Sequence, residues 1–134
     1  MRKAMYPAIF SSDGEGGYTV IFPDLLGCVT EGDSLVEAVE MAEDALGLYL
    51  YSLSEDGEAF PTPSDPMHIH CESDEFIDLI KWDELEYLRK TDNRAVKKTL
   101  TIPSWLNHKA EQHKLNFSQI LQRALTKEIK ALEG

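Results

Sequence analysis

A run of small and polar residues, Ser11 to Gly17, lies between two short apolar segments and constrains the fold more than any other feature of the chain. The flanking segments, Ala4 to Phe10 and Tyr18 to Phe22, contain β-branched and aromatic residues, and Pro23 ends the second. Two β-forming segments joined by a short glycine-rich turn are typical of a hairpin. With a third short strand expected at Gly27 to Thr30, the sequence predicts an antiparallel sheet.

A long amphipathic helix is predicted after these strands. Ser34 and Glu37 have capping-box spacing, in which each side chain satisfies a free backbone N–H group of the first turn. Apolar residues then recur at helical spacing and form one stripe: Leu35, Val39, Ala42, Leu46, Tyr49 and Leu53. Four acidic residues lie away from it and are expected to face solvent: Glu37, Glu40, Glu43 and Asp44. The helix is expected to end near Leu53.

The segment after this helix predicts an extended loop, because it contains three prolines, Pro61, Pro63 and Pro66. Further strands are expected at His68 to Cys71 and at Phe76 to Trp82, followed by a short helix at Asp83 to Lys90. A boundary is expected at Thr91 to Asn93. We call residues 1–92 the body and residues 93–134 the tail, and expect each to form one domain.

The tail predicts one strand followed by two helices. In the segment from Lys97 to Pro103, alternation places Leu100 and Ile102 on one face and Lys97, Thr99 and Thr101 on the other. The strand ends at Pro103, which cannot donate a ladder hydrogen bond. A helix is expected from Ser104 to about Lys114. Asn116 is a suitable N-cap for a second helix with its own apolar stripe: Phe117, Ile120, Leu121, Ala124, Leu125 and Ile129.

Such a tail is not expected to fold as a single copy. A lone strand has two unpaired edges, and about 40 residues is close to the size below which a domain rarely folds alone. Two copies would form a two-stranded antiparallel ribbon flanked by four helices, with Leu100 and Ile102 in the shared core. The tail therefore predicts a homodimer.

Charge divides the chain at the same boundary. The body has 21 acidic and 5 basic residues, a formal net charge of −16, and the tail has 3 acidic and 8 basic residues, a net charge of +5. A basic tail suits a phosphate backbone, whereas an acidic body repels nucleic acid and attracts a basic protein. Two modules with partners of opposite charge are expected.

The predicted ribbon gives the tail a candidate DNA-binding face. A two-stranded ribbon fits the major groove, and lysine and threonine donate to base edges and phosphates. The strand ending Leu100-Thr101-Ile102-Pro103 and the helix start Asn116-Phe117-Ser118-Gln119-Ile120-Leu121 resemble the ribbon-helix-helix DNA-binding family. The resemblance implies DNA contacts by six residues: Lys97, Thr99, Thr101, Asn116, Phe117 and Ser118. The interval from Pro103 to Asn116 is about one helical turn shorter than that family usually has.

Two other interpretations of the tail stay open. The same two helices also fit a helix-turn-helix arrangement, and the lysines also fit a structural tail with a solvated surface.

The body resembles the HicB antitoxin family over roughly residues 3–66. The resemblance is carried by Tyr6-Pro7-Ala8-Ile9-Phe10, by the segment Gly17-Tyr18-Thr19-Val20-Ile21-Phe22-Pro23-Asp24-Leu25-Leu26-Gly27-Cys28-Val29-Thr30-Glu31-Gly32-Asp33-Ser34, and by the helix start Glu37-Ala38. It implies an α+β fold with a truncated RNase H-like antiparallel sheet, one long helix and an appended DNA-binding tail. It also implies an antitoxin that neutralises a small basic ribonuclease toxin, HicA, and represses their shared operon.

The toxin-binding site is expected where the second strand ends, because apolar groups border a carboxylate there. The predicted contacts are Phe22, Pro23, Asp24, Leu25 and Leu26. Whether the homodimer joins a higher toxin–antitoxin assembly stays open.

An RNase H-like nuclease with a nucleic-acid-targeting tail is the alternative function. Two-metal chemistry needs several carboxylates converging from strands, but the segment Ala4 to Phe10 has no acid, and Asp13 and Glu15 lie in a turn. His68 and His70 would share one face of the expected strand, whereas Cys71 would point to the other side, and the further ligands of a four-ligand site are not identified. No metal site or cofactor is therefore expected. The sequence therefore favours a protein without catalysis.

The bulk properties favour a cytoplasmic protein. Its two cysteines, Cys28 and Cys71, have no metal-like spacing, and Cys28 is interpreted as a small packed residue. The apolar run after Met1-Arg2-Lys3 is too short for a signal sequence, and no stretch approaches the roughly 18 apolar residues of a membrane span.

Overall fold

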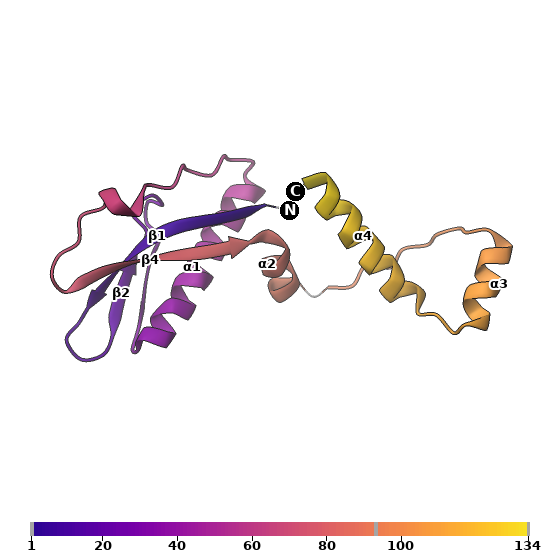
Figure 1. Ribbon diagram of the computed structural model, residues 1–134, viewed down its shortest axis with the longest axis horizontal. Coiled ribbons are helices and arrows are strands. Elements are labelled where there is room, and N and C mark those ends of the chain that lie inside the picture. Colours follow the sequence, from indigo (N-terminus) through magenta and orange to yellow (C-terminus); the bar gives the residue numbers. More distant parts are fainter. Residues whose placement is uncertain (1, 93, 134) are drawn as a thin grey trace.

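In the computed structural model, which describes residues 2–92 and 94–133, four strands and four α-helices are joined by loops and one 3-10 helix (Figure 1). The elements are β1 (Lys3–Ser12), β2 (Tyr18–Ile21), β3 (Val29–Gly32), α1 (Leu35–Glu55), η1 (Pro66–His68), β4 (Glu75–Asp83), α2 (Glu84–Thr91), α3 (Ser104–Gln112) and α4 (Phe117–Glu133). The mixed α+β class predicted from the sequence is confirmed. No helix within these residues has the length and apolarity needed to cross a membrane.

The body contains one sheet with strand order β3-β2-β1-β4, in which all three neighbouring pairs are antiparallel. The predicted hairpin is confirmed as β1 and β2. The third strand begins at Val29, two residues later than expected, because Gly27 adopts a left-handed φ of +80° and still belongs to a turn. The predicted strand at Phe76 to Trp82 is confirmed as β4.

The Ser34 half of the predicted capping box is confirmed at the start of α1. Ser34 has extended backbone dihedrals, and its side chain accepts a hydrogen bond from the backbone N–H group of Glu37 at 3.1 Å. This bond satisfies one of the free donors of the first turn. The four acids expected to face solvent, Glu37, Glu40, Glu43 and Asp44, are all exposed.

One face of the sheet packs against α1 and forms the core. The sheet contributes Tyr6, Ala8, Phe10, Val20, Ile80 and Trp82, and the helix contributes Ala38, Ala42, Leu46 and Leu50. The expected apolar stripe was therefore wrong at its first position, because Leu35 is 47% exposed whereas Ala38 is fully buried. Gly32 explains the difference, since it has no Cβ atom and lets the backbone of Ala38 approach β3 closely.

The predicted strand at His68 to Cys71 is wrong. Asp65 accepts a hydrogen bond from the backbone N–H group of Met67 at 2.9 Å, and Pro66 occupies the first helical position, so the 3-10 helix η1 forms there instead. His68 and His70 consequently do not lie along one strand. The expected short helix is confirmed as α2, which Asp83 caps by accepting a hydrogen bond from Glu86 at 3.2 Å.

Among its described residues the tail has the two predicted helices, but the strand expected to end at Pro103 does not form, because a single copy offers no second strand to pair with it. Residues 94–103 are all exposed and pair with no other strand among the described residues. Figure 1 shows α3 and α4 set apart from the sheet. No described tail residue is buried. Asn93, at the expected domain boundary, lies outside the described residues.

Candidate functional site

The loop between β2 and β3 carries the predicted toxin contacts and is tightly organised. Three backbone hydrogen bonds close it, from Phe22 N to Cys28 O at 3.1 Å, from Leu25 N to Phe22 O at 3.1 Å and from Cys28 N to Leu25 O at 3.0 Å. Gly27 supplies the left-handed residue that the turn requires. The loop therefore presents its side chains in fixed directions.

Those directions divide the predicted contact residues into two groups. Phe22 and Leu25 are only 1% exposed and belong to the core, so they hold the loop in place and cannot contact a partner directly. Leu26 is 92% exposed, and Pro23 is also exposed. Leu26 therefore offers apolar surface to a partner on a turn that backbone hydrogen bonds hold in place.

Asp24, the acidic member of the predicted set, is partly buried and already has partners within the chain. Its carboxylate accepts hydrogen bonds from the backbone N–H group of Ser64, at 2.9 Å, and from the Ser64 hydroxyl. We call this pair the loop clamp, because it ties the β2–β3 loop to the proline-rich segment. The Tyr6 hydroxyl donates to Pro61 O in the same segment, and burial and then the nearby Asp24 charge raise the pKa of Tyr6.

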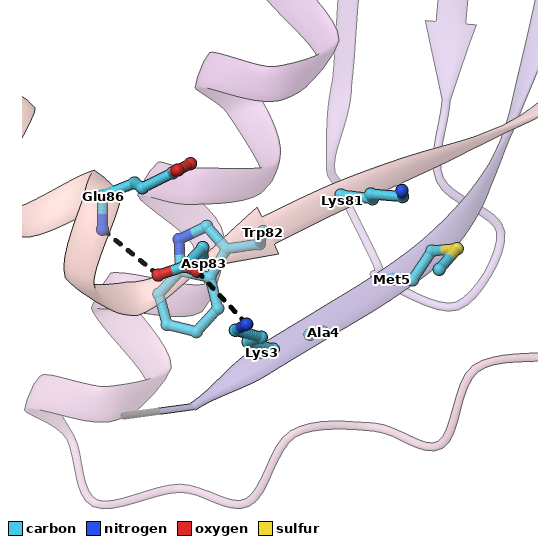
Figure 2. A pocket seen from close by; sticks show the side chains of 7 residues that line it. All are labelled: Lys3, Ala4, Met5, Lys81, Trp82, Asp83 and Glu86. Atoms are coloured by element: carbon cyan, nitrogen blue, oxygen red, sulfur yellow. Dashed lines mark hydrogen bonds and ion pairs between the residues drawn. The ribbon is translucent and has the colours of Figure 1, made fainter. Parts of the chain in front are cut away.

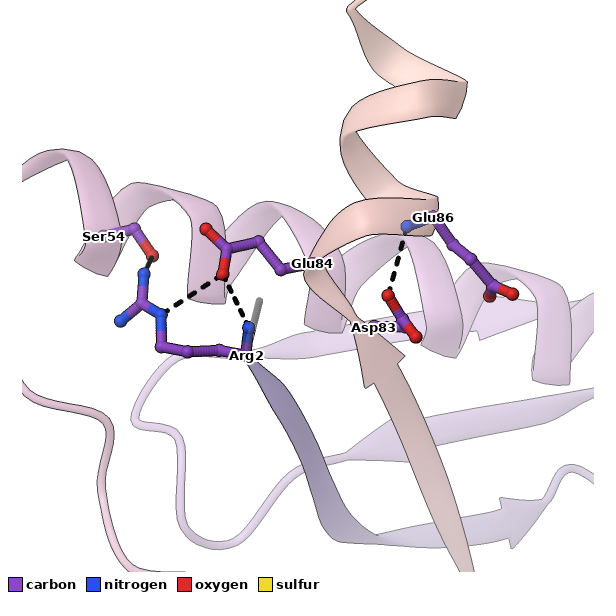
Figure 3. Close-up of polar contacts among 5 residues, drawn as sticks. All are labelled: Arg2, Ser54, Asp83, Glu84 and Glu86. Atoms are coloured by element: carbon purple, nitrogen blue, oxygen red, sulfur yellow. Dashed lines mark hydrogen bonds and ion pairs between the residues drawn. The ribbon is translucent and has the colours of Figure 1, made fainter. Parts of the chain in front are cut away.

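Polar contacts at the N-terminal end of β1 join it to α1 and α2. Figure 3 shows the Arg2 side chain between Ser54 of α1 and Glu84 of α2. The backbone N–H group of Arg2 also donates to the Glu84 carboxylate at 2.9 Å, and the guanidinium lies 4.5 Å from the Phe60 ring centroid. These contacts fasten the N-terminal strand to α1 and α2.

A depression of about 530 Å³ lies near the same end of the sheet (Figure 2). Its lining mixes cations, anions and apolar groups: Lys3, Ala4, Met5, Lys81, Trp82, Asp83 and Glu86. Lys3 Nζ lies 3.9 Å from Asp83 Oδ2, and Trp82 Nε1 is buried without a hydrogen-bond partner within the described residues. The mixed charges favour no class of small ligand.

The carboxylates considered for a two-metal nuclease do not converge. Asp13 Oδ1 accepts hydrogen bonds from the backbone N–H groups of Glu15, at 2.7 Å, and Gly17, at 3.0 Å, and so stabilises the turn between β1 and β2. His70 Nε2 lies 3.0 Å from Glu72 Oε1 on the surface. In the part of the chain that the structure describes, no three His, Cys, Asp or Glu side chains are grouped to hold a metal ion.

The predicted DNA-binding residues of the tail are accessible. Lys97, Thr99 and Thr101 are exposed in the segment before α3. Asn116 caps α4, as its sequence predicts, by accepting a hydrogen bond from Gln119 N at 3.0 Å. Phe117 and Ser118 therefore form the first turn of α4, where backbone N–H groups and the helix dipole favour a phosphate.

The turn between α3 and α4 is short and well defined. Lys114 has a positive φ of 52°, and the backbone N–H group of Leu115 donates to Ala110 O at 3.1 Å. These are features of a helix C-terminus that ends in a left-handed residue.

The apolar side chains of the tail remain in contact with solvent. Leu100, Ile102, Phe117, Leu125 and Ile129 are between 40% and 55% exposed. An apolar face of this extent on a short segment is typical of a surface that a partner covers.

Comparison with known proteins places the chain among antitoxins. The sequence matches the family model of HicB-like antitoxins of bacterial toxin–antitoxin systems over residues 6–124. It is 31% identical over 108 residues to an uncharacterized 14.9 kDa protein from the rep-hol intergenic region of Haemophilus phage HP1. This match covers 81% of this chain and 80% of the phage protein. It is 39% identical over 74 residues to antitoxin HicB of Escherichia coli K12, which covers 55% of this chain.

The chain spans about half the length of that HicB antitoxin, 51%. A solved structure gives a longer match. A chain of a toxin–antitoxin complex from Streptococcus pneumoniae superposes with a TM-score of 0.59 and 30% sequence identity, over 95% of this chain and 99% of that one. The likeness therefore includes the tail as well as the body.

Proposed function

The chain belongs to the HicB-like antitoxin family of bacterial toxin–antitoxin systems, and we propose that it neutralises a small basic HicA-type ribonuclease toxin and represses its own operon. The family match over residues 6–124 carries the proposal, because it includes the body and most of the tail. The charges support it, since a body of net −16 suits a basic toxin and a tail of net +5 suits DNA. In this proposal the chain acts by binding, without catalysis of its own.

The body binds the toxin and occludes its active site. Leu26 and Pro23 are the proposed contacts in the β2–β3 loop, because both are exposed on a turn that the core residues Phe22 and Leu25 hold in place. Asp24 contributes mainly through the loop clamp, since Ser64 already occupies its carboxylate. The surrounding acids tune the association rate more than the lifetime of the complex.

The tail joins two copies and binds operator DNA. The finer fold belongs to this proposal: residues 1–92 form a truncated RNase H-like domain, and residues 93–134 form a ribbon-helix-helix module. The unpaired segment 94–103 and the exposed apolar side chains of α4 support pairing with a second copy. Lys97, Thr99 and Thr101 then read the groove, while Asn116, Phe117 and Ser118 hold a phosphate at the start of α4.

Self-association of the chain distinguishes the ribbon-helix-helix interpretation of the tail from the helix-turn-helix interpretation. Truncation after Asp92 should weaken self-association if the ribbon holds two copies together. Leu100→Ser and Ile102→Ser in the full chain should do the same, because both side chains enter the core of the ribbon. If these changes leave the dimer intact, the ribbon loses its main support.

Cell growth during toxin expression tests the assignment of toxin binding. Residues 1–92 should restore growth, because the whole buried core lies within them. The same fragment should not bind operator DNA, because it lacks the tail. Residues 93–134 should not restore growth. Rescue by the tail alone, without rescue by the body, would reverse the roles of the two modules.

DNA binding is tested by titration of the full chain against operator and unrelated DNA at several salt concentrations. Thr99→Ala and Thr101→Ala should lower the preference for operator DNA, by about 1–3 kcal/mol for each good interaction with a base edge that the substitution removes. Lys97→Ala should also reduce the salt dependence if Lys97 neutralises a phosphate. Lys127→Ala on α4 is the matched control. If the variant with alanine at positions 97, 99 and 101 binds operator DNA with unchanged affinity, the assignment of this face is contradicted.

A further inference from the structure

The sheet has a second face, opposite α1, on which apolar side chains from all four strands lie in one row. The cross-strand partners are Val29 with Ile21, Ile21 with Ile9, and Ile9 with Ile77. Directly paired residues project from the same face of a sheet, so these four side chains are neighbours. With neighbouring strands about 4.8 Å apart, the row is about 14 Å long.

This row is part of a larger apolar patch that solvent reaches. Val29 is 54% exposed, Ile21 42%, Leu79 42% and Met5 40%, whereas Ile9 and Ile77 are half-buried between their neighbours. Leu79 on β4 and Met5 on β1 lie on the same face, although Pro7, between Met5 and Ile9 and paired with Leu79, is fully buried. Figure 2 shows Met5 on β1 next to the strand that carries Lys81. We call these six residues the open sheet face: Met5, Ile9, Ile21, Val29, Ile77 and Leu79.

We infer that the open sheet face is the docking surface for the cationic toxin, which extends the contact proposed for Leu26. The inference rests on the proposed function. The loop that carries Leu26 joins β2 directly to β3, which contribute Ile21 and Val29 to the row. The patch has the composition of an interface core, and the loop and the charged border supply the rim that a stable complex also needs.

The charges around the open sheet face favour a basic occupant. The next row across the sheet is Glu31, Thr19, Ser11 and Glu75, so a carboxylate stands at each end of it. Hydrogen bonds from the backbone N–H group of Glu72 and from the Ser11 hydroxyl lower the pKa of Glu75 and so favour its charged form. A toxin surface with an apolar strip and cationic groups about 14 Å apart would match this border.

The same charges disfavour a second body as the occupant. Two bodies packed through this face would bring together two net charges of −16. Two lysines border the end of the patch near Met5. Lys3 already lies 3.9 Å from Asp83, whereas Lys81, paired with Met5, has no carboxylate within 4 Å among the described residues. Self-association is therefore left to the tail.

Charge-matched substitutions test the inference in the full-length chain. Ile21→Lys and Val29→Lys place a cation on the open sheet face, and Leu48→Lys adds the same charge to the exposed side of α1, where Leu48 is 65% exposed. Because the net charge changes equally, long-range attraction to the toxin is matched. Affinity for the purified cognate HicA-type toxin is measured by calorimetry, and thermal unfolding verifies that each variant is folded.

The expected result is a loss of toxin affinity of at least about 10-fold for Ile21→Lys and Val29→Lys, and of less than about 3-fold for Leu48→Lys. Equal affinities in all three variants, with wild-type binding intact, would overturn the inference and leave the proposed function standing. A drop in self-association with unchanged toxin affinity would assign the face to a second copy and also overturn it. Failure of the wild-type chain to bind the toxin would instead refute the proposed function.

Discussion

Replacing Gly32 with alanine should destabilise the body strongly, although it adds a single carbon atom. Gly32 ends β3 and is buried beneath the first turns of α1. A Cβ atom there would lie 2.4 Å from Ala38 N, 2.7 Å from Ala38 Cα and 2.8 Å from the carbonyl carbon of Glu37. All three are backbone atoms, so no side-chain rotation relieves the overlap, and the start of α1 must move away from the sheet.

The magnitude follows from that displacement. Overpacking a close-packed interior typically costs about 1–3 kcal/mol. Moving α1 also loosens the packing of Ala38 and Ala42, which are fully buried, so we expect the upper end of this range. The φ of Gly32 lies outside the left-handed region, so the cost is steric and not conformational.

Gly47→Ala is the matched control, because it is the same chemical change at a buried glycine within α1 itself. A Cβ atom at Gly47 would lie 3.5 Å from the Tyr87 ring, which is an ordinary van der Waals contact. Alanine has a higher helix propensity than glycine by about 1 kcal/mol. The two substitutions should therefore change the free energy of unfolding with opposite signs.

Urea unfolding, followed by the fluorescence of Trp82, measures both changes. Trp82 is buried in the body and Trp105 is exposed in the tail, so a Trp105→Phe background isolates the body signal. With a slope of about 1–3 kcal/mol per molar urea, Gly32→Ala should lower the midpoint by at least about 1 M. The reasoning is refuted if Gly32→Ala unfolds at the wild-type midpoint, or if Gly47→Ala is destabilised as much.

Three further outcomes are expected. Gly27→Ala should cost about 1–2 kcal/mol in thermal unfolding despite open space around it, because its φ of +80° disfavours a side chain. Ser64→Ala removes the hydroxyl of the loop clamp and should speed proteolysis of the proline-rich segment. Hydrogen bonds from Glu72 N and the Ser11 hydroxyl lower the pKa of Glu75. The stability that ionised Glu75 contributes is therefore present above the ordinary pKa of 4.5 and is lost on acidification. Ser11→Ala should raise the pKa of Glu75 in an NMR titration.

Local sequence signals predicted much of the body. The glycine-rich turn between two β-forming segments predicted the β1–β2 hairpin, and the Ser34 cap predicted the start of α1. These features depend on neighbouring residues, which a single sequence displays directly. The prediction of a strand at His68 to Cys71 was wrong because another local interaction outweighed β propensity. Asp65 accepts a hydrogen bond from Met67 N, which favours a 3-10 turn.

Longer-range features were harder to predict. The buried face of α1 includes Ala38 because Gly32 admits it, and that contact joins two elements whose orientation depends on the whole sheet. The burial of Phe22 and Leu25 follows from the turn between β2 and β3, in which Leu25 N bonds to Phe22 O. The predicted toxin-binding segment thus contains both core anchors and surface residues, and only the structure separates them.

The open sheet face could be predicted in part from strand alternation, because Ile9, Ile21 and Ile77 occupy positions opposite to the buried series. Alternation does not show whether a second layer covers such residues, since apolar groups on both faces are also typical of fully buried strands. Packing of α1 on a single face decides this point in the structure. The signal was therefore present in the sequence, but its functional meaning was not.

Exposed apolar faces occur on both modules, and their charges suggest how the assembly is arranged. The tail has a net charge of +5 and gains from a polyanion, so two tails placed side by side on DNA have their repulsion neutralised. The body has a net charge of −16, and bodies repel one another unless a basic protein lies against each. We therefore infer that the tails join two copies while the bodies stay apart, which leaves each open sheet face free for one toxin. Light scattering of the purified complex should then give equal numbers of toxin and antitoxin chains, and a single toxin per antitoxin dimer would contradict this arrangement.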